Sequence, residues 1–341
     1  MAHPSYQGRF IWTELLCHDA ASAAAFYARI LSWQSQPFSP GSPYLVFSGA
    51  SGAPIAGNMS LPAEARAMGT VPHWRTYIGA SDVDAIVAQA SRLGARILEP
   101  ARDMPGVGRA ALLADPEGAR FGVFRPLTEA SASSTPGEAP FPWYELAARS
   151  RETALAFYQQ LFGWELRTPM DMGGGFHYQP FGLDGQDFGG CYTIPADRPM
   201  PPAWCPYARS SSADEVAGKV VAAGGQLLHG PVDVPNGGRI VQFLDPQHAM
   251  FAVVSMAPIA AAKPPAAPKP AAISKPAADA KPARKPKAKP KKRAAKRPAA
   301  KPRKAKRKAA KPKARRAAPS KRKPAPKPAR KAGRRKPVRR K

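Results

Sequence analysis

Two Trp-x-Glu motifs carry the carboxylates of this 341-residue chain that are best placed for chemistry. Trp12 and Glu14 form the first motif, and Trp143 and Glu145 form the second. Residues two apart on a strand project from the same face, so each tryptophan shares a surface with its glutamate. A carboxylate among aromatic rings is desolvated, which raises its pKa and suits it to general acid or base catalysis. Glu145 and Glu14 are therefore the candidate catalytic residues.

Both motifs belong to an internal repeat. Residues 12–33 match residues 143–164 at an offset of 131, and further along Trp74 matches Trp204 at an offset of 130. Similarity over such a length, with a shift of a single residue, indicates a tandem duplication.

The repeat sets the expected domain boundaries. The two copies are predicted at residues 1–126 and 141–257, joined by a linker rich in Ser, Pro, Gly and Ala at residues 127–140. Each copy has about 120 residues, enough for a hydrophobic core of its own. A disordered tail follows at residues 258–341.

Each copy is predicted to contain two strand–helix–strand–strand–strand units. In the first copy a strand over residues 10–17 precedes a helix over residues 20–32. The second unit repeats this order, with a helix over residues 82–93. Asp82 is suited to cap the start of that helix, and Gly94 to follow its end.

This pattern resembles the vicinal oxygen chelate superfamily, the fold of glyoxalase I, bleomycin-resistance proteins and extradiol dioxygenases. The resemblance rests on D-x6-FY-x3-LxW after the first strand and on a DPEG or DPQH turn before the last, and it covers about residues 8–256. It implies an α+β fold with tandem domains, in which two βαβββ units form a cup that holds a ligand and often a divalent metal. Because the superfamily spans isomerases, lyases, dioxygenases and binding proteins, the resemblance does not define a reaction.

The positions at which metal-dependent members carry ligands hold few donors here. The resemblance places the first ligand on Trp12 and Trp143, the second on Arg75 and Cys205, and the last on Gly122 and Ala252. The remaining ligand falls within residues 57–60, which contain no acid, and only Asp187 lies near the matching segment of the second copy. Since a zinc, iron or manganese site needs three or four converging donors, we predict neither a metal nor another cofactor.

In place of a metal, the resemblance implies an aromatic cup with one acid. Side chains two apart on the strands should converge there with the glutamates. The expected ligand-binding residues are Trp12, Arg75, Tyr77, Trp143, Cys205, Tyr207 and Arg209.

Each of these residues also has a purely structural interpretation. Glu14 can pair with Arg75 and simply satisfy a buried charge. Glu145 lacks that arginine, so Arg209 or His177 is its candidate partner. The tryptophans can pack in the core or at the rim instead of stacking on a ligand.

The remaining candidates are weaker. We expect His73 to be a solvated histidine at a strand edge, and His18 has no partners for a nucleophilic site. The glycines at residues 173–175 precede a strand, which suits a flexible lip over the second cup and not a phosphate loop. Asp115 and Asp245 are expected to stabilise turns.

The charge of the chain is concentrated in its C-terminal segment. Residues 258–341 hold 35 Lys and Arg and a single acid, Asp279, whereas the rest of the chain holds 17 basic and 22 acidic side chains. The tail thus has a net charge of +34 and the body one of −5. A segment of Lys, Arg, Ala and Pro cannot bury enough apolar surface to fold, so we expect it to bind DNA or another polyanion.

The three cysteines, Cys17, Cys191 and Cys205, form no CxxC pair and suit a reducing compartment. No signal peptide or membrane-spanning segment is expected, and we predict a cytoplasmic, nucleoid-associated protein without a membrane partner.

Three functions fit these observations. The first is a binding protein that captures a small apolar or aromatic molecule in metal-free cups, with a tail that binds DNA non-specifically. The second is a lyase, isomerase or oxygenase of the superfamily that uses Glu145 or Glu14 as its acid or base. The third is a nucleoid-associated protein that acts through its histone-like tail.

Overall fold

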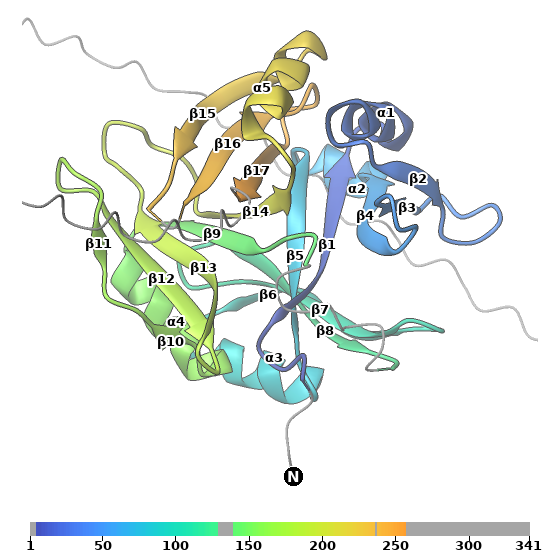
Figure 1. Ribbon diagram of the computed structural model, residues 1–341. Helices are drawn as coiled ribbons and strands as arrows, with labels where there is room; N and C mark the ends of the chain where they lie inside the picture. The colour runs from blue at the N-terminus through green and yellow to red at the C-terminus, as the bar shows by residue number, and fades with distance from the viewer. Residues whose placement is uncertain (1–4, 129–138, 236, 257–341) are drawn as a thin grey trace, which may run out of the picture. The chain divides into compact units, whose positions relative to one another are not determined.

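The computed structural model describes residues 5–128, 139–235 and 237–256. In these ranges each copy of the repeat forms one mixed β-sheet, and five helices accompany the two sheets (Figure 1). The α+β class and the tandem arrangement of βαβββ units are confirmed. The predicted tail lies outside the described residues.

The first sheet joins its two units at the centre. Its order is β2-β3-β4-β1-β5-β8-β7-β6, with β1 antiparallel to β5 and parallel to β4. The strands are β1 (Phe10–Cys17), β2 (Gln34–Pro37), β3 (Leu45–Ser48), β4 (Pro54–Ser60), β5 (His73–Gly79), β6 (Arg96–Met104), β7 (Gly108–Ala114) and β8 (Arg120–Pro126).

The second sheet repeats this topology. Its order is β10-β12-β13-β9-β14-β17-β16-β15, with β11 paired to β12. The strands are β9 (Trp143–Ala148), β10 (Glu165–Leu166), β11 (Met170–Asp171), β12 (His177–Leu183), β13 (Gln186–Thr193), β14 (Ala203–Arg209), β15 (Gln226–Asp233), β16 (Gly238–Leu244) and β17 (Met250–Met256).

Helix α3 begins and ends where the sequence predicts its caps. Asp82 accepts a hydrogen bond from the backbone N–H of Ala85, and Gly94 takes a φ of +92° just after α3, a conformation that favours glycine. The five-residue helix α2 was not predicted. The helices are α1 (Ala20–Leu31), α2 (Ala63–Ala67), α3 (Val83–Arg92), α4 (Arg151–Phe162) and α5 (Ala213–Ala222).

The expectation of a separate core in each copy is wrong. Buried side chains of both copies form one hydrophobic cluster. Phe10 stacks on Tyr144 with ring centroids 3.8 Å apart, and Trp74 lies 4.5 Å from Phe251. Helix α1 packs beside α5, and α3 beside α4, so each contact joins the two copies (Figure 1). The duplicated halves therefore share one interior.

Reciprocal hydrogen bonds connect the copies within that interior. The Tyr27 hydroxyl donates to Asp245 Oδ2 at 3.2 Å, and the Tyr158 hydroxyl donates to Asp115 Oδ2 at 3.1 Å. The other oxygen of each aspartate accepts backbone N–H groups of its own turn, which confirms the predicted turn role. Each aspartate thus holds its own turn and a helix of the opposite copy.

The same turns also cap helices of the opposite copy. Glu117 accepts from the backbone N–H of Ser150, before α4, at 2.9 Å. Gln247 accepts from the backbone N–H of Asp19, before α1, at 2.8 Å. The Glu of the DPEG turn and the Gln of the DPQH turn therefore accept backbone hydrogen bonds at the start of a helix in the other copy.

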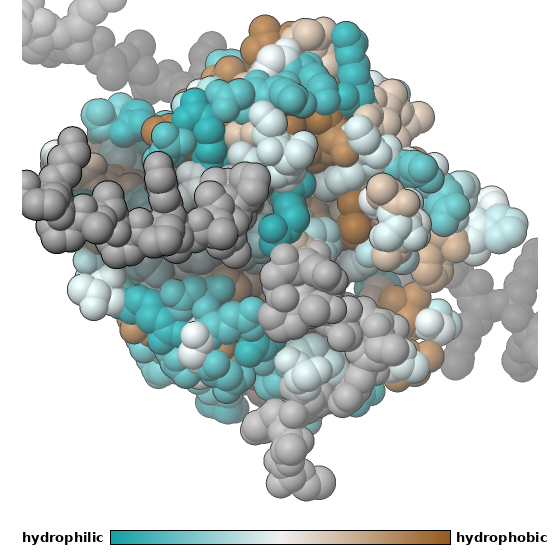
Figure 2. All heavy atoms as spheres, in the orientation of Figure 1, coloured by the Kyte–Doolittle hydropathy of each residue, from teal (hydrophilic) through white to brown (hydrophobic). Residues whose placement is uncertain are grey.

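On the face shown in Figure 2, hydrophobic residues are scattered among hydrophilic ones. Within the ranges that the structure describes, no helix combines the length and apolar character needed to cross a membrane.

Candidate functional site

Each sheet has one face in the shared core and an opposite face, which we name the cup face. Side chains alternate between them along a strand. Leu15 on β1 is fully buried in the core, and the neighbouring Glu14 lies on the cup face. Strand register places the predicted site residues opposite one another: Trp12 by Tyr77, Glu14 by Arg75, Trp143 by Tyr207, and Glu145 by Cys205.

The first cup holds a closed network around Glu14, which is only 6% exposed. Its Oε1 accepts from the Tyr77 hydroxyl at 2.7 Å and from Arg75 Nη1 at 3.3 Å. Its Oε2 accepts from the Tyr44 hydroxyl at 2.9 Å. The same hydroxyl accepts from Trp12 Nε1 at 2.9 Å. The structural alternative for Glu14, an ion pair with Arg75, is confirmed.

The second cup has the same plan without the cation. Glu145 Oε1 accepts from Gln242 Nε2 at 2.7 Å, and the same nitrogen donates to the Tyr207 hydroxyl at 2.6 Å. Trp143 Nε1 donates to the Tyr178 hydroxyl at 2.7 Å, and Tyr178 and Tyr207 also hydrogen-bond the carboxyl group. All of these partners are electrically neutral.

A neutral, buried setting changes the acidity of Glu145. Burial raises the pKa of this carboxyl to about 7, against the opposing effect of hydrogen bonds from Tyr207, Tyr178 and Gln242. The sequence predicted a shift in this direction. Burial also raises the pKa of the Cys205 thiol well above its ordinary value, so that the thiol stays protonated and is a poor nucleophile.

Neither predicted ionic partner of Glu145 contacts it. Arg209 Nε donates to the Ala139 carbonyl at 3.4 Å, at the start of the second copy. His177 is exposed on β12, where the strand register places its backbone opposite Asp171 of β11. The observed partner of Glu145 is Gln242 from β16. The role of Arg209 as a ligand-binding residue stays a prediction.

Apolar side chains surround Glu145 on the second cup face. Where the first cup has Arg75 and Gly122, the second has Cys205 and Ala252. The members of this small cluster are Cys205, Tyr207, Ala252 and Val254, with Trp143, Ile240 and Met250 packed against them. The second cup therefore combines one titratable carboxyl with a cluster of buried, mostly apolar side chains.

Sequence reasoning missed three residues of the networks: Tyr44, Tyr178 and Gln242. The signal for the tyrosines was a glycine on the adjacent strand. A Cβ atom at Gly57 would overlap the Tyr44 hydroxyl, and one at Gly190 would overlap the Tyr178 ring. Gln242 had no such signal, because its partner comes from a strand almost one hundred positions away.

The family's divalent metal does not fit these residues. A Cβ atom at Gly122 would overlap the Tyr77 ring, so an aromatic side chain fills the space at the expected last ligand. Among the described residues, no group of three or more His, Cys, Asp or Glu side chains is placed to hold a metal ion. No step of the proposed chemistry is therefore built on a metal.

The expectation of a solvated His73 is wrong. Its Nδ1 lies 2.8 Å from the Val71 carbonyl, and its Nε2 is buried without a hydrogen-bond partner within the described part of the chain. Burial lowers the pKa of His73 to about 4, so the ring is neutral at physiological pH.

The glycines at residues 173–175 all have positive φ and form the turn between β11 and β12. Their role as a lip stays a prediction.

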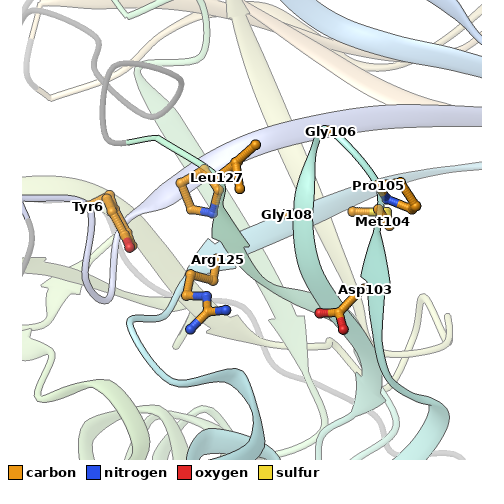
Figure 3. Close-up of a pocket in the computed structure, with 9 residues that line it drawn as sticks. Tyr6, Asp103, Met104, Pro105, Gly106, Gly108, Arg125 and Leu127 are labelled. Atoms are coloured by element: carbon orange, nitrogen blue, oxygen red, sulfur yellow. The ribbon is translucent and has the colours of Figure 1, made fainter.

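A pocket of about 440 Å³ lies away from both glutamates, beside the β6–β7 turn (Figure 3). Tyr6, Asp103 and Arg125 contribute to its lining. Asp103 is already paired with Arg109 at 3.0 Å. This pocket contains none of the predicted site residues.

Paired βαβββ units, each pair forming one sheet with a central carboxylate, define a protein of the vicinal oxygen chelate class. A family model described as a glyoxalase-like domain matches residues 12–124. The protein named "Putative glyoxylase CFP32" of Mycobacterium tuberculosis is 31% identical over 254 residues, which cover 74% of this chain and 96% of that protein. The chain therefore belongs to the glyoxalase-like family of this superfamily.

Other relatives and structures extend the comparison. The anthracycline biosynthesis protein DauV of a Streptomyces species is 28% identical over 257 residues, which cover 72% of this chain and 92% of that protein. A Mn(II)-bound glyoxalase from Novosphingobium aromaticivorans superposes with a TM-score of 0.51 at 16% identity, covering 73% of this chain and 82% of the other. A trihydroxybiphenyl dioxygenase from Sphingomonas wittichii gives 0.54 at 11%, covering 74% and 91%. At these identities the solved structures establish only the fold.

Proposed function

We propose that the second cup binds a small apolar or aromatic molecule, and that Glu145 exchanges a proton with it as a metal-independent acid or base. The observation that carries this proposal is the buried Glu145 carboxyl, whose hydrogen-bond donors among the described residues are all neutral. A general acid or base works best when its pKa lies near the operating pH, and the pKa of Glu145 is raised to about 7.

The apolar side chains around the carboxyl support the choice of ligand. Small ligands generally bind to apolar surfaces with a few fixed polar groups, and the second cup face has that composition. The name of the relative DauV points to hydroxylated aromatic ring systems as the first compounds to test. The first cup suits this role less, because Arg75 already neutralises Glu14.

Binding of 1,8-dihydroxyanthraquinone and 2-naphthol to the full chain tests the proposal. Fluorescence quenching should show one site, with an affinity that changes as pH passes through about 7. Glu145→Gln should remove this pH dependence, whereas Glu14→Gln should retain it. Native mass spectrometry of the freshly purified protein would identify any molecule that it retains. Binding that is equal at every pH in the wild type, or no binding of either compound and no retained molecule, would contradict the proposal.

A second proposed function, DNA binding, rests on the sequence of the tail. The 35 basic side chains against one acid between residues 258 and 341 provide the charge for phosphate contacts. The protein would then be held on the nucleoid while its cups act on a small molecule. An electrophoretic shift of duplex DNA by the full chain, absent with residues 1–257, is the expected result.

A further inference from the structure

We propose that Gln242 is the positioning residue of the second cup, and that Arg75 and Leu112 at the matching places keep the first cup out of the same chemistry. This inference rests on the proposed function of Glu145. Beyond that function, it identifies the residue that orients the Glu145 carboxyl. It also explains why the second cup exchanges a proton with a ligand and the first does not.

Both hydrogens of the Gln242 side-chain amide have an acceptor. An amide nitrogen has two hydrogens, and Nε2 directs one to Glu145 Oε1 at 2.7 Å and the other to the Tyr207 hydroxyl at 2.6 Å. Tyr207 accepts from the amide and is left free to donate its own proton to the carboxyl group. The three side chains form a closed triangle that fixes the orientation of the carboxyl.

This triangle also determines which oxygen carries the proton. The carbonyl oxygen of a protonated carboxyl is the better acceptor, so the N–H from Gln242 selects Oε1 as that oxygen. The acidic hydrogen is then confined to Oε2. A carboxylate has about four acceptor positions, and Gln242, Tyr178 and Tyr207 occupy three of them.

Within the described ranges, the tyrosines and cysteines around Glu145 do not titrate in the same range. The neighbours that can lose a proton all have pKa values raised by burial, and they remain protonated at neutral pH: Tyr178, Tyr192, Cys191, Cys205 and Tyr207. A pH dependence near neutrality in this cup therefore belongs to Glu145 and to the donors that hold it.

The first cup has different residues at the positions that match Gln242 and Cys205, and these change the environment of its glutamate. Leu112 pairs with Gly122 as Gln242 pairs with Ala252, so Leu112 occupies the place of Gln242. An aliphatic side chain cannot donate a hydrogen bond. The charge of Glu14 is balanced instead by Arg75, whose side chain is 16% exposed. The guanidinium occupies a place where the second cup has only the Cys205 thiol.

Two substitutions in the second cup should move its pH dependence in opposite directions. Gln242→Met has nearly the same shape but cannot donate, so the midpoint of pH-dependent binding of 2-naphthol to the full chain should rise. Cys205→Arg supplies the cation of the first cup, so the midpoint should fall. Gln242→Asn keeps an amide donor on a shorter side chain, so its midpoint should lie between those of the wild type and Gln242→Met.

A substitution in the first cup tests the converse. Arg75→Cys combined with Leu112→Gln should raise the number of 2-naphthol sites per chain from one to two. If Glu145→Gln abolishes the pH dependence but Gln242→Met leaves the midpoint unchanged, the role of Gln242 is wrong while the proposed function stands. If Glu145→Gln leaves the pH dependence of binding unchanged, the proposed function of Glu145 is wrong, whatever the result for Gln242→Met. Should Cys205→Arg not fold, the near-isosteric Gln242→Met still decides the question.

Discussion

At the scale of single residues, one guanidinium separates the environments of the two glutamates. Glu14 and Glu145 occupy equivalent strand positions, and each accepts hydrogen bonds from two tyrosines. Among the residues that the structure describes, a cation lies within ion-pair distance of Glu14 but not of Glu145. For Glu145, burial without a compensating charge favours the protonated form. The exchange of Arg75 for Cys205, together with that of Leu112 for Gln242, therefore changes what a carboxyl at the same strand position can do.

The raised pKa of Glu145 has a consequence for stability. Its folded value of about 7 exceeds the ordinary glutamate value of about 4.3, so the folded state binds more protons than the unfolded state between these limits. Stability contributed by the protonated group is complete at low pH and is lost as pH rises towards about 7. Ionisation in the buried site then costs roughly 3 kcal/mol above that pH.

Glu145→Gln should therefore stabilise the protein in a pH-dependent manner. The amide resembles the protonated carboxyl in size and cannot ionise. We expect the variant to gain roughly 2–3 kcal/mol relative to the wild type between about pH 5 and about pH 8. Urea unfolding of both proteins at these two pH values measures the gain, and the value at low pH serves as the internal reference. A difference that is the same at both pH values would show that Glu145 has an ordinary acidity.

The residues at the family's ligand positions predict that the folded protein does not depend on a metal. Trp12 and Trp143 supply no carboxylate or imidazole, and Tyr77 fills the space at Gly122. The full chain should contain less than about one tenth of an equivalent of zinc, iron or manganese per copy after growth with these metals. Its melting temperature and ligand binding should not change in a chelator. One equivalent per copy, lost together with binding in the chelator, would contradict this prediction.

The site could be predicted from the sequence only where its residues lie on adjacent strands. Trp12, Glu14, Arg75 and Tyr77 follow from the two-residue strand period and the pairing of two predicted strands. Gln242 contacts Glu145 across the second sheet, and one sequence contains no information on that approach. The strand period gives the face of the Arg209 side chain but not how far along the strand the cup extends, so its role in ligand binding stays a prediction.

At the scale of elements, the tyrosines of the repeated Phe-Tyr pair connect the two copies. The Tyr27 hydroxyl accepts from Trp74 Nε1 at 2.9 Å and donates to Asp245. The Tyr158 hydroxyl accepts from Trp204 Nε1 at 3.0 Å in the same way. The sequence predicts that these tyrosines lie on helices with a buried face. That each reaches an aspartate in the other copy depends on how the copies pack, which the repeat itself does not specify.

Tyr27→Phe and Tyr158→Phe should destabilise the protein by similar amounts. Each substitution leaves a buried indole N–H and a buried aspartate oxygen without their partner, at a cost of roughly 2–3 kcal/mol. Urea unfolding at neutral pH measures the loss. Tyr192→Phe is the control, because its hydroxyl has only a weak contact with Met200 Sδ at 3.9 Å and should cost less than about 1 kcal/mol. Losses no larger than that of the control would exclude a stabilising role for the reciprocal bonds.

Element boundaries were predicted best where local chemistry sets them. Asp82 and Gly94 bracket α3 as expected, since capping and a positive φ are properties of single residues. The sequence predicts a strand near residues 96–98, but β6 extends over Arg96–Met104. Its pairing with β7 passes through two register irregularities, so the side-chain alternation that reveals a strand in a sequence is interrupted.

At the scale of the whole molecule, the shared core predicts that neither copy folds alone. Residues 1–128 and 139–257, expressed separately, would each expose the aromatic side chains that pack across the copies. We expect each fragment to lack cooperative thermal unfolding and near-ultraviolet circular dichroism. Mixing the two fragments should restore both signals. A cooperative unfolding transition in either fragment by itself would show that this copy folds as an independent domain.

The tail adds a separate prediction for the whole chain, because its charge has the opposite sign to that of the body. Each Lys or Arg that neutralises a phosphate releases counterions, so the logarithm of DNA affinity should fall with the logarithm of salt by about 0.9 per contact. With 35 basic side chains available, the full chain should show a steep slope. Binding should not depend on sequence, since residues 258–341 contain no aromatic side chain to stack on bases. Salt titrations of duplex binding by the full chain and by residues 1–257 measure this effect, with polyphosphate as competitor. Equal affinity of the two proteins, or binding of the full chain that is insensitive to salt, would exclude the tail as the DNA anchor.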